Sequence, residues 1–156
     1  TQRFMARLHC AFAAAGLPSA GRVKILPGLG HGDYKRVNQL GDLMLDSLHW
    51  SGGNTSLDAL ATGLPIVTLP GTMMRGRQSA AMLAMIGLQE LIVSDPEQYV
   101  KLAIDLGRDA ERRRQLSERI VANRHRLYDD MAPTKVLSEF FIRMTRGGDL
   151  PAADPA

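Results

Sequence analysis

The chain has 156 residues, of which 45% are hydrophobic and 22% are charged, and its formal net charge is +3. This is the length of one globular domain with an ordinary composition, which argues against a fibrous, disordered or disulfide-stapled protein. No apolar run is long enough to cross a bilayer and no signal-peptide pattern begins the chain, so we expect no membrane partner.

The N-terminal part of the chain predicts a helix, a strand and a glycine-rich loop. Apolar residues recur at helical spacing over residues 2–15. Alternating residues over 22–27 predict a short strand that ends at its proline. The glycines of residues 28–33 predict a loop, and residues 34–40 predict a short helix.

Two single residues bear on the origin of the chain. Cys10 is its one cysteine, which excludes an internal disulfide and favours a reducing, cytoplasmic compartment. The first residue is Thr1 rather than methionine, so we expect a piece cut from a longer protein.

The rest of the chain alternates short strands with helices. Strands are predicted at residues 42–46, 66–69 and 91–93, and helices at residues 54–62, 77–86, 96–106, 109–127 and 133–146. This alternation predicts an α/β domain, with a Rossmann-like parallel sheet covered by helices on both faces. We expect the domain to span residues 1–146 and the tail, residues 147–156, to be disordered.

A glycine turn between the strand at 42–46 and the next helix predicts an anion site. Gly52 and Gly53 have no Cβ, so a ligand can approach the backbone closely. Asn54, Thr55 and Ser56 then add hydroxyl and amide groups beside the free N–H donors at the positive end of a helix. A phosphate is the usual occupant of such a site.

A second interpretation of the same residues needs no ligand. Thr55 and Asp58 have the spacing of a capping box, which would only close the helix end. The loops at 27–33, 47–54 and 70–76 all follow predicted strands, however, and parallel sheets bind ligands at the carboxyl ends of their strands. This convergence favours the phosphate site.

Positive charge gathers late in the chain. Seven arginines lie between residues 108 and 126, interleaved with acidic residues, as on a solvated helix face. A nucleic-acid-binding helix is the alternative, but no interleaved aromatic residues support it, so we expect no nucleic acid. No His, Cys or Asp spacing suggests a metal.

Several segments, in order and spacing, resemble the O-GlcNAc transferase family, in its bacterial, tetratricopeptide-repeat and SPINDLY-like form. They are residues 42–46, 52–60, 63–71, 77–81 and 87–92. The run from His31 to Tyr34 is also similar to the related bacterial adhesin N-glucosyltransferases.

The resemblance implies a GT-B fold, in which two Rossmann-like domains hold a nucleotide sugar between them. It implies an inverting enzyme that needs no metal or other cofactor and transfers GlcNAc or glucose from a UDP-sugar to a protein side chain. The chain would be most of the second, UDP-binding domain. The repeats and the first domain, which would supply acceptor contacts and the base, would lie upstream, so we expect no catalytic residue here and no activity of the isolated piece.

The resemblance also assigns binding roles. The turn and helix start matched by Gly53, Asn54 and Thr55 would hold the diphosphate, and Asp58 would bind the ribose hydroxyls, which suits an acceptor-only carboxylate. His31 and Tyr34 would lie against the uracil. From its place beside the third loop, Arg77 could pair with phosphate or only contact the helix start.

The chain also departs from the family. The family often has a His-Thr-Thr run where this chain has Gly53, Asn54 and Thr55, and its uracil-contacting lysine and histidine appear as His31 and Tyr34. Two other functions stay open: a non-catalytic nucleotide-binding or scaffold module, and the nucleic-acid-binding module.

Overall fold

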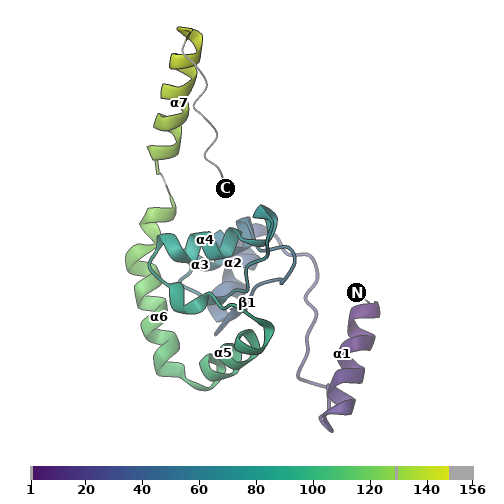
Figure 1. The fold of residues 1–156 in the computed structure, drawn as a ribbon. Coiled ribbons are helices and arrows are strands. Elements are labelled where there is room, and N and C mark those ends of the chain that lie inside the picture. Colours follow the sequence, from purple (N-terminus) through teal and green to yellow (C-terminus); the bar gives the residue numbers. More distant parts are fainter. Residues whose placement is uncertain (1, 129, 148–156) are drawn as a thin grey trace. The chain divides into compact units, whose positions relative to one another are not determined.

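The computed structural model describes residues 2–128 and 130–147 (Figure 1). They form two compact units, one ending at Tyr34 and the other beginning at Lys35, so the boundary falls inside helix α2 (His31–Leu40). Apart from Gly147, the tail predicted to be disordered lies outside the described residues. No helix among the described residues combines the length and apolarity that spanning a membrane requires.

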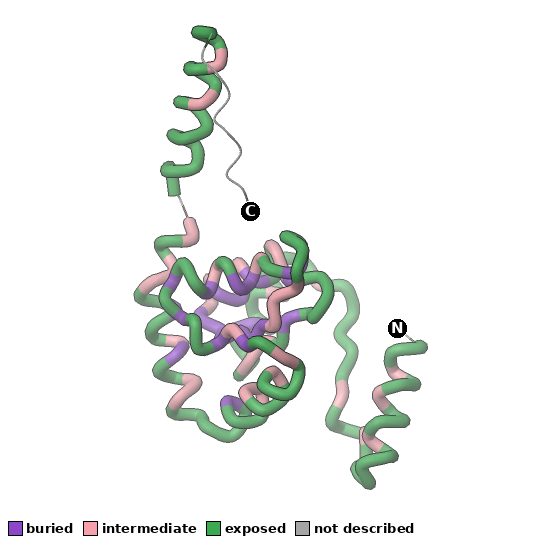
Figure 2. Tube along the Cα trace, in the orientation of Figure 1, coloured by how far each residue is buried: buried purple, intermediate pink, exposed green. Residues whose placement is uncertain are grey.

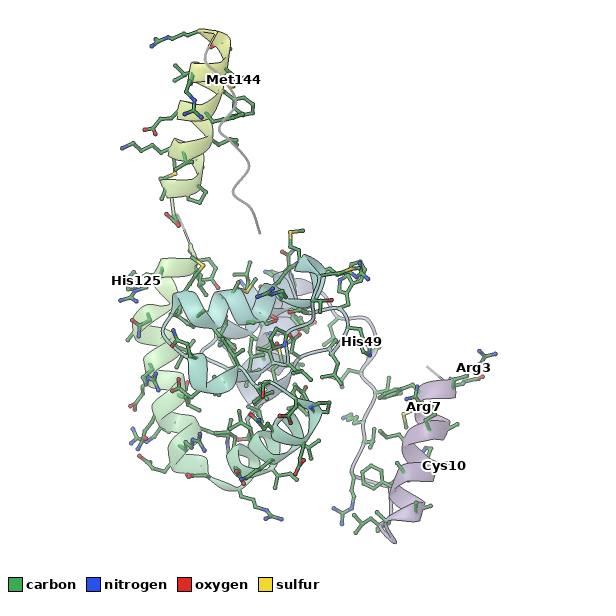
Figure 3. The ribbon with its side chains drawn as sticks, in the orientation of Figure 1. Arg3, Arg7, Cys10, His49, His125 and Met144 are labelled. Atoms are coloured by element: carbon green, nitrogen blue, oxygen red, sulfur yellow. The ribbon has the colours of Figure 1, made fainter. Side chains whose placement is uncertain are left out.

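The first unit contains helix α1 (Gln2–Ala14), which confirms the predicted N-terminal helix. The helix ends at Gly16, whose φ of 68° lets the Leu17 N–H donate to the carbonyl of Phe12 at 2.9 Å. No residue of α1 is buried, and Arg3, Arg7 and Cys10 stand along it (Figure 3).

The predicted strand at residues 22–27 is wrong. These residues form no strand in the described part of the chain, and Ile25 and Leu26 remain exposed. A strand needs a neighbour to pair its backbone groups, and alternation along the sequence cannot show whether a neighbour is present. The predicted loop at 28–33 is also too long, because α2 already begins at His31.

The second unit is built on a small parallel sheet. Strand β1 (Met44–Leu45) pairs in parallel with β2 (Ile66–Val67), with Met44 opposite Ile66. A parallel bridge between Thr68 and Ile92 adds a third segment beside β2. The predicted strand at 91–93 is thus reduced to this bridge, because residues Gln89–Leu91 form a 3₁₀ turn.

Helices cover both sides of these strands. Helices α3 and α4 lie on one side and α5 on the other (Figure 1). Their bounds are α3 (Asn54–Ala61), α4 (Gln78–Met85), α5 (Pro96–Arg108), α6 (Ala110–Asn123) and α7 (Ala132–Thr145), with 3₁₀ turns η1 (Met74–Gly76), η2 (Gln89–Leu91) and η3 (Arg124–Leu127). The predicted α/β class with a parallel sheet is therefore confirmed.

Local signals set several helix ends as the sequence predicts. Asp95 caps α5 by accepting from the Gln98 N–H at 2.8 Å, and Pro96 occupies the first turn. Gly87 follows α4 with a φ of 74°, and the Leu88 N–H donates back to the Leu83 carbonyl at 2.9 Å.

The hydrophobic core lies between the strands and these helices. Buried residues gather on α3, β2, α4, α5 and α6, while α7 has none (Figure 2). The fully buried members include Leu60, Ile66, Leu83, Leu106 and Ile120. Helices α3, α4, α5 and α6 thus each contribute an apolar face to a shared core, as the helical spacing predicts.

We expect Leu60→Ala to lower the free energy of unfolding by about 2–5 kcal/mol, because Leu60 is fully buried and its removal leaves a cavity. Urea denaturation measures the loss. Val100→Ala, at an exposed position of α5, is the control and should change the free energy by less than about 0.5 kcal/mol. Similar losses in both variants would contradict this placement of the core.

Candidate functional site

Two of the three loops predicted to converge do meet. The loop after β1 and the loop after β2 are joined where the Ser51 N–H donates to the Arg75 carbonyl at 2.9 Å. The second loop is closed on itself by a bond from the Gly71 N–H to the Gly76 carbonyl at 2.8 Å. Both follow parallel strands, so this edge is the carboxyl edge of the sheet, where such folds bind ligands.

Helix α3 begins directly at the glycine turn. Gly53 is the N-cap residue, and its carbonyl accepts from the N–H groups of Ser56 and Leu57 at 3.0 and 3.1 Å. Asn54 and Thr55 are exposed, and their backbone N–H groups form no hydrogen bond among the described residues. This leaves two N–H donors at the positive end of the helix, which suits an anion.

The capping-box interpretation is wrong. With Gly53 at the N-cap, Thr55 and Asp58 are the second and fifth residues of α3, and no side chain caps the helix. A capping box needs its hydroxyl at the N-cap and its acid at the third helical position. The helix starts earlier than the Thr55 pattern suggests because the glycine turn already supplies the non-helical residue.

Behind the turn lies a buried carboxylate. Asp46 directly follows β1 and is 4% exposed. One carboxylate oxygen accepts from the N–H groups of Gly52 and Ser47 at 2.8 and 2.9 Å. The other accepts from the hydroxyls of Ser51 and Thr68 at 2.8 and 2.7 Å. Four donors therefore satisfy this carboxylate, which is what a buried charge requires.

Three buried hydroxyls continue this network to the neighbouring helices. Ser79 Oγ lies 2.8 Å from both Ser51 Oγ and Ser56 Oγ, and the Ser79 N–H donates to Ser51 Oγ at 2.9 Å. Ser56 belongs to the first turn of α3 and Ser79 to the first turn of α4. The predicted site residue Ser56 thus has its side chain in this network, and it is fully buried.

Asp46, Ser51, Thr68 and Ser79 were missed as site residues by the sequence reasoning. The usable signal is a polar residue in an apolar run: Thr68 follows two buried β-branched residues, and Ser79 precedes two alanines. Such residues need buried partners. The sequence does not say which partners these are.

Gly52 is required by close packing of the turn. A Cβ at Gly52 would lie 2.3 Å from Ser56 Oγ and 2.8 Å from Thr55 Oγ1. At Gly53 the nearest atom would be Gln78 Oε1 at 2.8 Å, which is the end of a flexible side chain. The first glycine therefore lets the backbone lie against the hydroxyl network, whereas the second is less constrained.

Gly52→Ala should lower the free energy of unfolding by about 1–3 kcal/mol, because Ser56 Oγ cannot move without breaking its bond to Ser79. Gly53→Ala serves as the control and should cost less, since Gln78 can swing away. Denaturant titration of both variants tests this. Equal destabilisation would show that the close approach at Gly52 is unimportant.

Tyr99 of α5 reaches the same region from the other side of the sheet. Its hydroxyl donates to the backbone carbonyl of Asp46 at 2.8 Å. Burial, with a further contribution from the Asp46 charge, raises the pKa of Tyr99 from its ordinary 10 to about 12. The neutral phenol, which donates this bond, is the form that the fold favours.

Alkaline pH should therefore weaken the fold through Tyr99. Between about pH 10 and 12 the unfolded chain loses the phenolic proton while the folded chain keeps it, so the free energy of unfolding should fall with rising pH. Urea denaturation across this range should give a shallower fall for Tyr99→Phe. Parallel pH dependence in the two proteins would contradict the raised pKa.

The rim of the site is exposed and partly apolar. Trp50 is 68% exposed, and the Arg75 guanidinium carbon lies 5.6 Å from its ring centroid. Arg77 is exposed and is the N-cap residue of α4. This position agrees with the predicted contact to the helix start and also leaves the side chain accessible to a ligand. His49 is exposed in the loop after β1 (Figure 3).

The predicted uracil residues lie in the first unit. His31 and Tyr34 occupy the first turn of α2 rather than a loop, and the Tyr34 N–H donates to the Gly30 carbonyl at 2.9 Å. Glycine disfavours helix, which is why the sequence predicts a loop up to residue 33, yet Gly32 is accommodated within α2. Their part in binding stays a prediction.

The arginine-rich segment, residues 108–126, runs from the end of α5 through α6 into η3, and three of its seven arginines, all on α6, pair with acidic side chains. Arg113 pairs with Asp42 at 3.1 Å, Arg114 with Glu111 and Glu118, and Arg119 with Glu90. Residues that are already neutralised in this way contribute little to a phosphate-binding surface. Across residues 2–128 and 130–147, no group of three or more His, Cys, Asp or Glu side chains is arranged to hold a metal ion.

The parallel sheet, with a glycine turn and a helix start at its carboxyl edge, defines an α/β domain of the Rossmann-like class. The sequence model of Glycosyl transferase family 41 matches residues 7–134. Because this match covers most of the chain, the chain belongs to glycosyl transferase family 41.

Named relatives agree with this membership. The chain is 35% identical over 79 residues to the UDP-N-acetylglucosamine–peptide N-acetylglucosaminyltransferase of Caenorhabditis elegans. This match covers 51% of the present chain and 7% of that protein. It is 32% identical over 109 residues to the probable UDP-N-acetylglucosamine–peptide N-acetylglucosaminyltransferase SPINDLY of Arabidopsis thaliana, covering 69% and 11%. The chain therefore spans about a tenth of the length of these relatives.

A solved structure is similar in fold. A mutant of the O-GlcNAc transferase of Thermobaculum terrenum matches with a TM-score of 0.77 and 34% identity, over 91% of this chain and 28% of that one. The family resemblance and the GT-B type of fold expected from the sequence are therefore confirmed.

Proposed function

We propose that this chain is the donor-binding half of an inverting protein glycosyltransferase, which transfers GlcNAc or glucose from a UDP-sugar to a protein side chain. Membership of glycosyl transferase family 41 supports this, as do relatives named as UDP-N-acetylglucosamine–peptide transferases. The observation that carries the proposal is the glycine turn that leads into α3, with exposed N–H donors at Asn54 and Thr55.

In this proposal the turn receives the diphosphate of the donor. The N–H groups of Asn54 and Thr55 donate to phosphate oxygens, and the dipole of α3 favours the negative charge. The hydroxyl of Thr55 is exposed beside them and can donate as well. Gly52 and Gly53 keep the approach free of side chains. Backbone donors thereby take the place that a cation would otherwise fill.

The remaining nucleotide contacts follow the predicted roles. Asp58, partly buried on α3, accepts from the two ribose hydroxyls. His31 and Tyr34 contact the uracil, and Arg77 pairs with a phosphate oxygen. The catalytic base and the acceptor protein's contacts belong to parts of the longer protein outside this chain, so the chain binds a UDP-sugar without transferring it.

Calorimetric titration with UDP, pyrophosphate and a UDP-sugar tests the proposal, in the presence of EDTA and then of magnesium. We expect UDP to bind, with an affinity that EDTA does not abolish. A chain that binds UDP but gives no sugar transfer in the full-length protein would be the scaffold module of the alternative. The absence of UDP binding would refute the proposal.

Asp58→Asn should weaken UDP binding by about ten- to a hundred-fold, because hydrogen bonds to a charged group are worth about 1.5–3 kcal/mol and the amide directs N–H donors at the ribose hydroxyls. Pyrophosphate has no ribose, so it should bind the variant nearly as well as the parent chain. The same titrations measure both. An equal loss for UDP and pyrophosphate would count against the ribose role.

A further inference from the structure

We propose that Asp46 is a positioning residue for the donor phosphates. Its carboxylate holds the Gly52 turn and the first turn of α3 in the conformation that presents the N–H groups of Asn54 and Thr55. This inference rests on the proposed function, because it concerns how the same site binds phosphate.

The backbone of Asp46 is fixed by the sheet and by α5. The Asp46 N–H donates to the Val67 carbonyl at 3.0 Å, and its own carbonyl accepts from the Tyr99 hydroxyl at 2.8 Å. The carboxylate therefore projects from a rigid element. A ligand-binding loop that is hydrogen-bonded to such a group is already held in place. A loop without these bonds would have to be ordered when the ligand binds, which costs binding free energy.

The chemistry of the four contacts requires a carboxylate. Gly52 and Ser47 donate to one oxygen, and Ser51 and Thr68 donate to the other. Among side chains of this size only an ionised carboxylate accepts at both ends, whereas asparagine would present two N–H donors at one end. No Lys, Arg or His side chain of the described residues forms an ion pair with Asp46, so its carboxylate is stabilised by these four neutral donors.

A series of buried hydroxyls connects Asp46 to the first turn of α3, whose backbone would face the phosphates. Ser51 links Asp46 to Ser79, and Ser79 links to Ser56 in the first turn of α3. These four side chains are all buried, so water does not compete for the bonds. The exposed N–H groups of Asn54 and Thr55 lie on the same turn of helix as Ser56.

The charge of Asp46 also has an opposing effect on phosphate binding. The negative charge of Asp46 repels a bound phosphate, and removing it would by itself strengthen UDP binding. The four donors already point at this charge and offset it, so we expect the loss of geometry to dominate. The direction of the change in affinity decides between the two effects.

The test compares Asp46→Asn with Leu116→Ala, a buried position of α6 that serves as a control for lost stability. Both are made in the full-length protein, and binding of UDP and pyrophosphate is measured well below each melting temperature. We expect Asp46→Asn to weaken both ligands by about ten-fold, the equivalent of one lost hydrogen bond to a charge. Leu116→Ala should leave both affinities unchanged.

The relative losses of UDP and pyrophosphate affinity distinguish a positioning role from a direct ribose contact. A ribose contact would weaken UDP alone, whereas a positioning residue for phosphate weakens UDP and pyrophosphate equally. The donor KM should rise and the acceptor KM should not. Unchanged or stronger binding by Asp46→Asn overturns the inference, as does an equal loss in Leu116→Ala. If the parent protein binds neither ligand, the proposed function itself has failed.

Ser79→Ala provides a second variant should Asp46→Asn fail to fold. It removes the hydroxyl between Ser51 and Ser56 and leaves the four donors of Asp46 in place. A loss of several-fold for both UDP and pyrophosphate is expected. Unchanged affinities for both would overturn the inference.

Discussion

The buried carboxylate of Asp46 connects the sheet, the glycine turn and the helices that begin beside it. Asp46 directly follows strand β1, its carboxylate accepts from four donors, and its backbone carbonyl accepts from the Tyr99 hydroxyl. A charge that is withdrawn from water is tolerated only when its partners are held in place. The same requirement therefore fixes the sheet, the glycine turn and, through Ser79, the starts of α3 and α4.

This arrangement explains how so small a sheet can hold the glycine turn in one conformation. The two residue pairs between β1 and β2 and the one bridge give little ordering by backbone hydrogen bonds alone. The buried hydroxyls and the core contributed by α3, α4, α5 and α6 supply the rest. Under the proposed function a rigid turn favours binding, since a diphosphate binds best to donors that are already in position.

Local features of the chain were predictable. Helix ends at Gly87 and Asp95, the class of the fold and the glycine turn all depend on residues close together in sequence. The strand at 22–27 and the extent of the loop before α2 were wrong. A strand exists only when a partner pairs with it, and neither the alternation of side chains nor a proline reports on that partner.

The sequence by itself determined that a glycine turn leads from β1 into a helix, because Gly52, Gly53 and a helix start are adjacent. Only the tertiary structure decided that Asp46 stands behind it. Thr68 reaches Asp46 across 22 residues, and Ser79 reaches Ser51 across 28, where parallel strands bring their carboxyl ends to one edge. Each of these polar residues looks ordinary alone. They are buried together because segments distant in the sequence pair in parallel, and no local sequence pattern shows which segments pair.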